Sequence, residues 1–163
     1  MTNGSVEMAS ANTACTVDAG RAAILELLQR GVVGAEDVSR LRREFFSEGG
    51  ASQAQAEALF AIERSGIAGG AEWTEFFVET ITSHVVWELR PTGIVSEEQA
   101  QWLIDQVDRT KSITALAALI NVLAEADRIP AWLPAAARGR AAAGWKGVDE
   151  ALDAVRSEAR IAA

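Results

Sequence analysis

Hydrophobic residues recur at three- and four-residue steps along most of the chain, a spacing that predicts α-helices. The clearest case is the stretch from Ala71 to Arg90, which Pro91 ends. Its apolar positions include Trp73, Phe76, Phe77, Val78, Ile81, Val85, Val86, Trp87 and Leu89. Because these positions cover most of the helix circumference, we expect a central helix with neighbours on several sides.

Capping residues predict where several other helices begin and end. Serine followed three residues later by glutamine is a capping box, which predicts helix starts at Ser52 and at Ser96. Gly66 is typical of a residue that ends a helix. Thr114 is the predicted N-cap of a further helix that runs to about Ala126.

The two ends of the chain complete the predicted organisation. Residues 1–17 are polar and have no period, so we expect a disordered tail there. A first helix is predicted from Asp18 to Gly31. Near the C-terminus, short helical patterns run from Pro134 to about Ala143 and from Val148 to about Ile161. The prediction is an all-α single domain over residues 18–163, with about eight helices.

The turns of the two halves repeat at one spacing, which predicts an internal duplication. Gly31 and Val33 match Gly93 and Val95, 62 residues later, and residues 49–51 match 111–113 at the same offset. We interpret this as two copies of a three-helix unit, at about 18–66 and 71–127, related by a pseudo-two-fold axis, with an addition at 128–163. The glycines allow a positive φ at each turn, and we expect each valine to form a short extended bridge against its counterpart.

The glycine turn followed by a capped helix resembles a degenerate EF-hand. With Gly93 at the sixth loop position, Glu88 takes the first and Gln99 the twelfth. A calcium loop also needs oxygen ligands at positions three and five, and Arg90 at position three would repel a cation, so calcium binding is not expected.

The whole plan also resembles the TerB-like family of tellurite-resistance operons, which are small, acidic, all-helical proteins with a pseudo-repeat. The resemblance covers roughly Asp18 to Ala126 and depends on the glycine turns before capped helices. It implies a fold of this kind and a divalent-metal or stress-response role. Family turns commonly carry Asp before Gly, whereas Arg30 and Thr92 stand there in this chain.

Composition and charge narrow the classes of partner. The chain has 163 residues, of which 49% are hydrophobic, and a formal net charge of −8. An acidic protein does not attract nucleic acid or an anionic membrane, so neither is expected as a partner. The longest apolar run, from Ile113 to Ala124, is too short for a membrane span. With no secretory pattern and a single cysteine, Cys15, the expected location is the cytoplasm.

His84 and Glu88 are the candidate chemical pair, because residues four apart share one face of a helix. They could act as an acid/base or metal pair, or His84 could be a core histidine that hydrogen-bonds to Glu88 or to a carbonyl one turn back on its helix. Glu26 and Glu88 occupy equivalent positions near helix C-termini, where a carboxylate opposes the helix dipole. They are therefore the candidate ligands of a weak divalent-cation site. No other cofactor is expected.

Five tryptophans are many for a chain of this size, and they supply the candidate binding residues. Trp73 and Trp87 lie on the central helix, where we expect them in the core. Trp102 stands where the first repeat has Arg40, and Trp132 lies between two prolines. Exposed aromatic residues anchor partners or cover the protein's own core, and the sequence leaves both open for Trp102, Trp132 and Trp145.

These observations favour a non-enzymatic, cytoplasmic interaction or regulatory module that binds a protein partner or itself, with a stress-linked role implied by the TerB-like resemblance. Trp102, Trp132, His84 and Glu88 are its candidate binding residues. The alternative is a divalent-cation-binding protein of TerB-like type that uses Glu26 and Glu88. An enzyme that uses His84 and Glu88 is the third hypothesis; phosphate-binding loops, nucleophile elbows and zinc-protease motifs are absent from the sequence.

Overall fold

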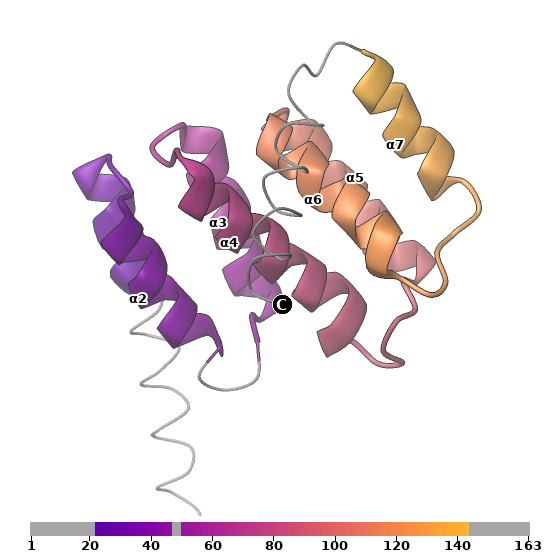
Figure 1. Ribbon diagram of the computed structural model, residues 1–163, viewed down its shortest axis with the longest axis horizontal. Coiled ribbons are helices and arrows are strands. Elements are labelled where there is room, and N and C mark those ends of the chain that lie inside the picture. The colour runs from indigo at the N-terminus through magenta and orange to yellow at the C-terminus, as the bar shows by residue number, and fades with distance from the viewer. Residues whose placement is uncertain (1–21, 47–49, 144–163) are drawn as a thin grey trace, which may run out of the picture.

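The computed structural model describes residues 22–46 and 50–143 of the chain. These residues are helical, with no strand among them, so the predicted all-α organisation is confirmed at this level (Figure 1). After a helical stretch at residues 22–30, the elements are α2 (Ala35–Phe46), α3 (Gln53–Ser65), α4 (Ala71–Thr82), η1 (Ser83–Glu88), α5 (Glu97–Thr110), α6 (Ile113–Glu125) and α7 (Leu133–Ala142). The predicted tail at 1–17 and the predicted helix from Val148 lie outside the described residues.

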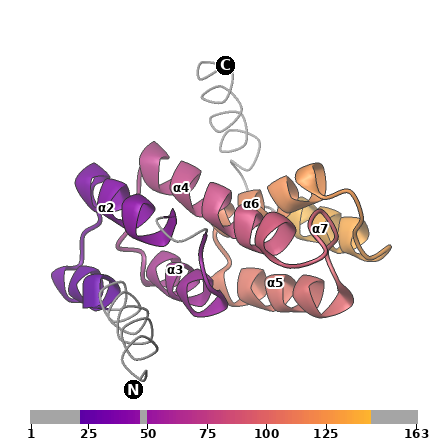
Figure 2. The same cartoon turned by 90° about the horizontal axis from the view of Figure 1, so that it is seen from below.

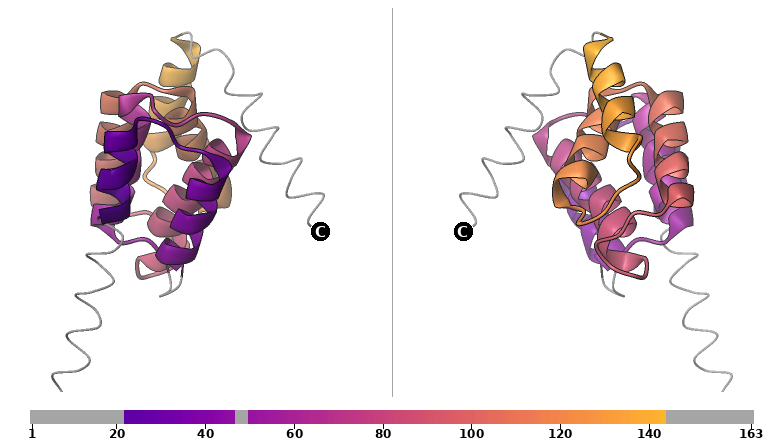
Figure 3. Two further views of the ribbon diagram at one scale, coloured as in Figure 1. Left: turned by 90° about the vertical axis from the view of Figure 1, so that its left-hand side faces the viewer. Right: turned by 90° about the vertical axis from the view of Figure 1, so that its right-hand side faces the viewer.

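The helices follow one another along the long axis of the molecule in roughly their order in the chain (Figure 1). The helical stretch at 22–30 and α2 lie at one end, and α7 lies at the other (Figure 3). Within this array α4 packs between α2 and α6, while α3 packs beside α5, so the helices form two layers (Figure 2). Contacts of α3 with α4 and α6, and of α5 with α6, join the layers.

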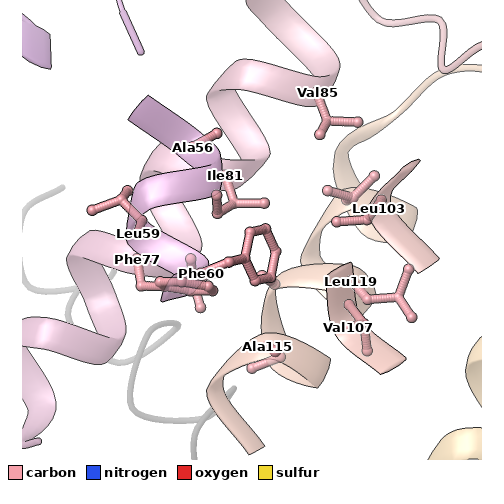
Figure 4. Close-up of a cluster of buried hydrophobic side chains, with 14 of the residues drawn as sticks. Ala56, Leu59, Phe60, Phe77, Ile81, Val85, Leu103, Val107, Ala115 and Leu119 are labelled. Carbon is pink, nitrogen blue, oxygen red and sulfur yellow. The ribbon is translucent and has the colours of Figure 1, made fainter. Parts of the chain in front are cut away.

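The core is a single cluster of buried side chains that extends from Ile24 to Ala137. Its middle is formed where α3, α4, α5 and α6 meet (Figure 4). There Phe60 meets Phe77 edge to face, with ring centroids 5.0 Å apart. Each of these helices contributes an apolar stripe, and no single helix could bury its stripe alone. The cluster therefore depends on helices from both halves of the chain.

The predicted central helix begins at Ala71 and occupies the centre of the array as α4 followed by η1. Its residues Trp73 and Ile81 are fully buried, since α4 contacts α2, α3 and α6. The expectation for Trp87 is wrong, because its side chain is 46% exposed. The last turn is wound as a π-helix, which displaces Trp87 from the face predicted by a regular α-helical period.

Capping residues position three of the helix starts. Both predicted capping boxes are present, with Ser52 at the start of α3 and Ser96 at the start of α5. The prediction for α6 is wrong by two residues. Ser112 is the N-cap, with its hydroxyl oxygen accepting from the Ala115 backbone N–H at 3.1 Å, while Thr114 lies inside the helix. Either residue can cap a helix, and the tight turn at Lys111, with φ of 50°, selects the earlier one.

Two isolated parallel bridges hold the loops, but not in the predicted pairing. The Val33 backbone N–H donates to Ile67, in the loop after α3, at 3.2 Å. In the second half, Val95 donates to Arg128, in the loop after α6, at 2.9 Å. Each turn therefore pairs within its own half, and the expected bridge between Val33 and Val95 is a wrong prediction. The glycine positions are correct, since Gly31 and Gly93 have φ of 74° and 79°.

Candidate functional site

The candidate site is organised by η1, the π-helical turn that ends the central helix. Pro91 prevents a further α-helical turn, and the backbone N–H of Gly93 binds the Val86 carbonyl at 2.7 Å. In a π-helix residues five apart face one another, so the Ser83 hydroxyl reaches Glu88 at 3.1 Å. The turn therefore positions both His84 and Glu88, and π-helical turns are frequent at functional sites.

His84 is buried, with only 4% of its surface exposed, and it is held from outside its own helix. Its Nδ1 donates to the carbonyl oxygen of Ala51, 2.8 Å away, in the segment that leads into α3. A carbonyl oxygen can only accept, so Nδ1 carries a proton, and a ring with this single proton leaves Nε2 as an acceptor. No described residue hydrogen-bonds to Nε2. The structural reading of His84 predicted such a carbonyl, but one turn back on the same helix rather than at Ala51.

Glu88 holds the same segment from the other side. Its Oε1 accepts from the Ala51 backbone N–H at 3.1 Å, and its Oε2 lies 3.6 Å from Nδ1 of His84. A Cβ added to Gly50 would collide with this carboxylate, and Gly50 has φ of 124°. Together His84, Glu88 and Ser83 fix residues 50 and 51 against the end of the central helix. This explains why a carboxylate is placed at a helix C-terminus, where the dipole is unfavourable.

A cleft of about 310 Å³ opens beside His84. Its walls are η1 and the first turns of α3 and α5, which contribute Gln53, Leu89, Ser96, Glu98 and Gln99, with Trp102 one turn further along α5. The Trp102 ring lies 5.7 Å from the His84 ring and also contacts Phe60 edge to face. Ser96 has the only hydroxyl among the described lining residues, and it caps α5. The cleft thus combines an aromatic wall, hydrogen-bond acceptors and one carboxylate.

A second hollow of about 690 Å³ follows α2 and is lined by arginines and acids, including Arg30, Asp37, Arg40 and Arg42. Three of these arginines lie beside acidic side chains. Arg30 binds Asp37, Arg42 binds Glu79 of α4 and lies over the Phe76 ring, and Arg40 lies 3.7 Å from Glu26. Arg30, together with the Gly34 backbone N–H, lowers the pKa of Asp37. These pairs give the arginines a structural role in joining α2 to its neighbours.

The predicted binding tryptophans are tied to the protein's own helices. Trp102 is half-buried and its indole N–H donates to Glu57 of α3 at 3.1 Å. Trp132 is half-buried at the start of α7 and donates to Glu97 of α5 at 2.6 Å. Trp132 therefore attaches the last described helix to the core. Of these two, Trp102 alone lines the cleft, and Trp145 lies outside the described residues.

The other two described tryptophans also donate their indole N–H to a glutamate of a neighbouring helix. Trp73 donates to Glu63 of α3 at 2.6 Å, and Trp87 donates to Glu125 of α6 at 3.0 Å. The buried indole N–H of Trp73 needs an acceptor, and a glutamate on the adjacent helix supplies it.

Glu26 and Glu88, the two predicted cation ligands, share no hydrogen-bond or ion-pair partner among the described residues. Glu26 has a side chain 58% exposed and faces Arg40, while Glu88 binds Ser83 and Ala51. Among residues 22–46 and 50–143, no group of three or more His, Cys, Asp and Glu side chains could hold a metal ion. The divalent-cation role therefore stays a prediction.

The sequence analysis named His84, Glu88 and Trp102, which the structure brings close together. It did not name Gly50 and Glu98 as site residues, although they lie beside them. Glu98 carried no signal, because an acid in the first turn of a helix is explained by the helix dipole alone. Gly50 did carry one, since glycine allows a close approach of side chains to the backbone. Its partner Glu88 could not be inferred, because it lies on an element far away in the sequence.

Comparisons with known proteins add nothing to the site. A scan against protein-family models, a search of curated proteins and a search of solved structures each found no match. The TerB-like and EF-hand-like resemblance stays a prediction. In the described part of the chain, no helix is long and apolar enough to cross a membrane.

Proposed function

We propose that this protein is a non-enzymatic helical binding module, and that it captures a side chain of a protein partner in the cleft beside His84. The observation that carries the proposal is the His84 ring, which is largely buried but lines an open cleft, and whose Nε2 has no hydrogen-bond partner among the described residues. A ligand group could bond to this nitrogen in place of water.

The geometry favours binding over catalysis. Ala51 and Glu88 occupy the Nδ1 side of His84, and the Ser96 hydroxyl is used as a helix cap, so no activated nucleophile is formed by these groups. Pockets for small ligands generally begin at about 300 Å³, so this cleft suits one inserted side chain better than a large substrate. The third hypothesis, an enzyme using His84 and Glu88, has less support.

The test is a titration with a panel of capped single-residue amides that cover the side-chain classes, followed by NMR. The indole N–H resonance of Trp102 reports on the cleft, while that of the exposed Trp87 reports on the surface elsewhere. We expect at least one probe to shift the Trp102 resonance at millimolar concentration and leave that of Trp87 in place. If every probe leaves Trp102 unchanged, the proposal is wrong.

A blocking variant with a matched control sharpens this test. Gln53→Trp places a bulky side chain on the rim of the cleft, at an exposed position whose amide donates to Glu57. Gln101→Trp makes the same change at an exposed position of α5 outside the cleft, where the amide donates to Asp105. We expect only Gln53→Trp to abolish the response of Trp102. Equal loss in both variants would mean that the probe binds elsewhere.

We infer that the two halves are duplicated three-helix units, and three features support this. A glycine with positive φ follows the first helix of each half, each half makes one bridge, and serine caps stand at Ser52 and Ser112. The spacing is not uniform: α5 begins 62 residues after α2 (Glu97 against Ala35), but α6 begins 60 after α3 (Ile113 against Gln53). A TerB-like, stress-linked role and a cytoplasmic location remain part of this proposal.

A further inference from the structure

The charged and aromatic groups of the cleft indicate the chemistry of its ligand. His84 lines the cleft and its Nδ1 donates to Ala51, so in the singly protonated ring Nε2 is an acceptor. Glu98 is the charged side chain among the described lining residues, and no lysine or arginine is among them. Gln53 and Gln99 add amides that can donate or accept, so the charge that the described lining residues offer is negative.

Further carboxylates lie directly behind the lining. Glu88 approaches His84 at 3.6 Å, and Glu57 accepts the indole N–H of Trp102. Trp102 adds an aromatic ring, and aromatic rings attract cations electrostatically. One carboxylate and an indole thus line the cleft, and two further carboxylates contact its lining residues.

The helix N-termini at the cleft act in the opposite direction, but weakly. The first turns of α3 and α5 carry the positive ends of their helix dipoles, which would favour an anion. In each helix the capping box already binds two of the free backbone N–H groups, and Glu97 and Glu98 lie in the first turn of α5. The negative side chains therefore outweigh the dipoles.

We propose that the cleft binds the cationic group of an arginine or lysine side chain from a basic partner segment. The inference rests on the function proposed above. The net charge of −8 would steer such a segment towards the protein. The guanidinium or ammonium would donate to Nε2 of His84 and to Glu98, beside the Trp102 ring.

The experiment uses four probes of similar size: the N-acetyl amides of arginine, lysine, norleucine and glutamate. Norleucine preserves the aliphatic stem of lysine and removes its charge. The Trp102 indole resonance is followed in the full chain at low salt. Cation–aromatic attraction together with a carboxylate contact predicts that arginine or lysine binds about tenfold more tightly than norleucine.

Two variants test the role of the carboxylate. Glu98→Gln removes the charge in the cleft and should weaken the binding of the cationic probes about fivefold, as expected for one exposed charge pair. Glu97→Gln, in the same helical turn but bonded to Trp132 instead, should leave binding nearly unchanged.

The outcomes separate this inference from the proposed function. If norleucine or glutamate shifts Trp102 at lower concentration than arginine and lysine do, the cation inference is overturned while side-chain capture stands. If none of the four probes shifts Trp102, the cation inference is overturned, and side-chain capture fails as well only if the wider panel also leaves Trp102 unchanged. Equal losses in Glu98→Gln and Glu97→Gln would also contradict the cation inference.

Discussion

At the scale of single residues, the contact of Gly50 with the Glu88 carboxylate shows how tightly the candidate site is built. Any larger residue at position 50 needs both a strained backbone and a displaced carboxylate. Because Glu88 also accepts from Ala51 and Ser83, it cannot move without breaking those hydrogen bonds. His84 then loses its orientation, since Ala51 supplies its acceptor.

We expect Gly50→Ala to lower the free energy of unfolding by roughly 3 kcal/mol, from the left-handed backbone and the collision combined. Gly31→Ala is the control, because Gly31 also has a positive φ but an added Cβ meets nothing within 4 Å. That variant should cost about 1 kcal/mol, for the backbone alone. Urea unfolding of both variants measures the difference. Similar losses of unfolding free energy in the two variants would show that the Glu88 side chain moves aside at little cost.

At the scale of helices, much of the arrangement follows from local rules. The starts of α3 and α5 were predictable, because a capping box satisfies backbone groups of its own turn. The start of α6 was not, since Ser112 and Thr114 are both able to cap. The π-winding of η1 and the partners of the bridges depend on contacts between distant segments. Trp87 was misplaced for the same reason.

Contacts between helices also include a bidentate ion pair that joins α7 to α5. Arg140 donates from Nε and Nη2 to the two oxygens of Asp108, at 2.6 Å each. The hydrogen bonds from Arg140 lower the pKa of Asp108 and raise that of Arg140. A lowered carboxyl pKa in the folded state stabilises the protein above the unfolded pKa, near about 4, and this stability is lost as pH falls through the folded pKa.

We therefore expect Asp108→Asn to destabilise the protein at pH 7 by at most about 1 kcal/mol, because the side chain is 48% exposed and water screens the pair. The difference from the original chain should shrink to nothing as the pH falls below the folded pKa. Urea unfolding of both proteins at several pH values measures this difference in the free energy of unfolding. Asp105→Asn, on the same helix, removes a charge without breaking an arginine pair and should alter stability less at pH 7. A loss that persists in acid would contradict the argument.

At the scale of the whole molecule, the helices are arranged along a line, so the free energy needed to open a helix locally depends on its place in that line. The central α4 contacts α2, α3 and α6, whereas α7 packs mainly on α6 at one end of the array (Figure 1). A segment surrounded by others opens only when the whole structure unfolds, while an end segment can detach locally.

Hydrogen exchange followed by mass spectrometry should therefore find the slowest backbone amides in α4 and distinctly faster ones in α7. The predicted central helix explains this order, since its apolar circumference is covered on several sides. Equal protection of α4 and α7 would indicate that the array unfolds as one unit.

The four indole-to-glutamate hydrogen bonds have a practical consequence. Each crosses a different junction, joining α4 to α3, η1 to α6, α5 to α3, and the start of α7 to α5. The chain has no tyrosine, so its ultraviolet emission comes almost entirely from tryptophan. Variants that keep one indole at a time would turn each junction into an optical sensor, without an attached dye.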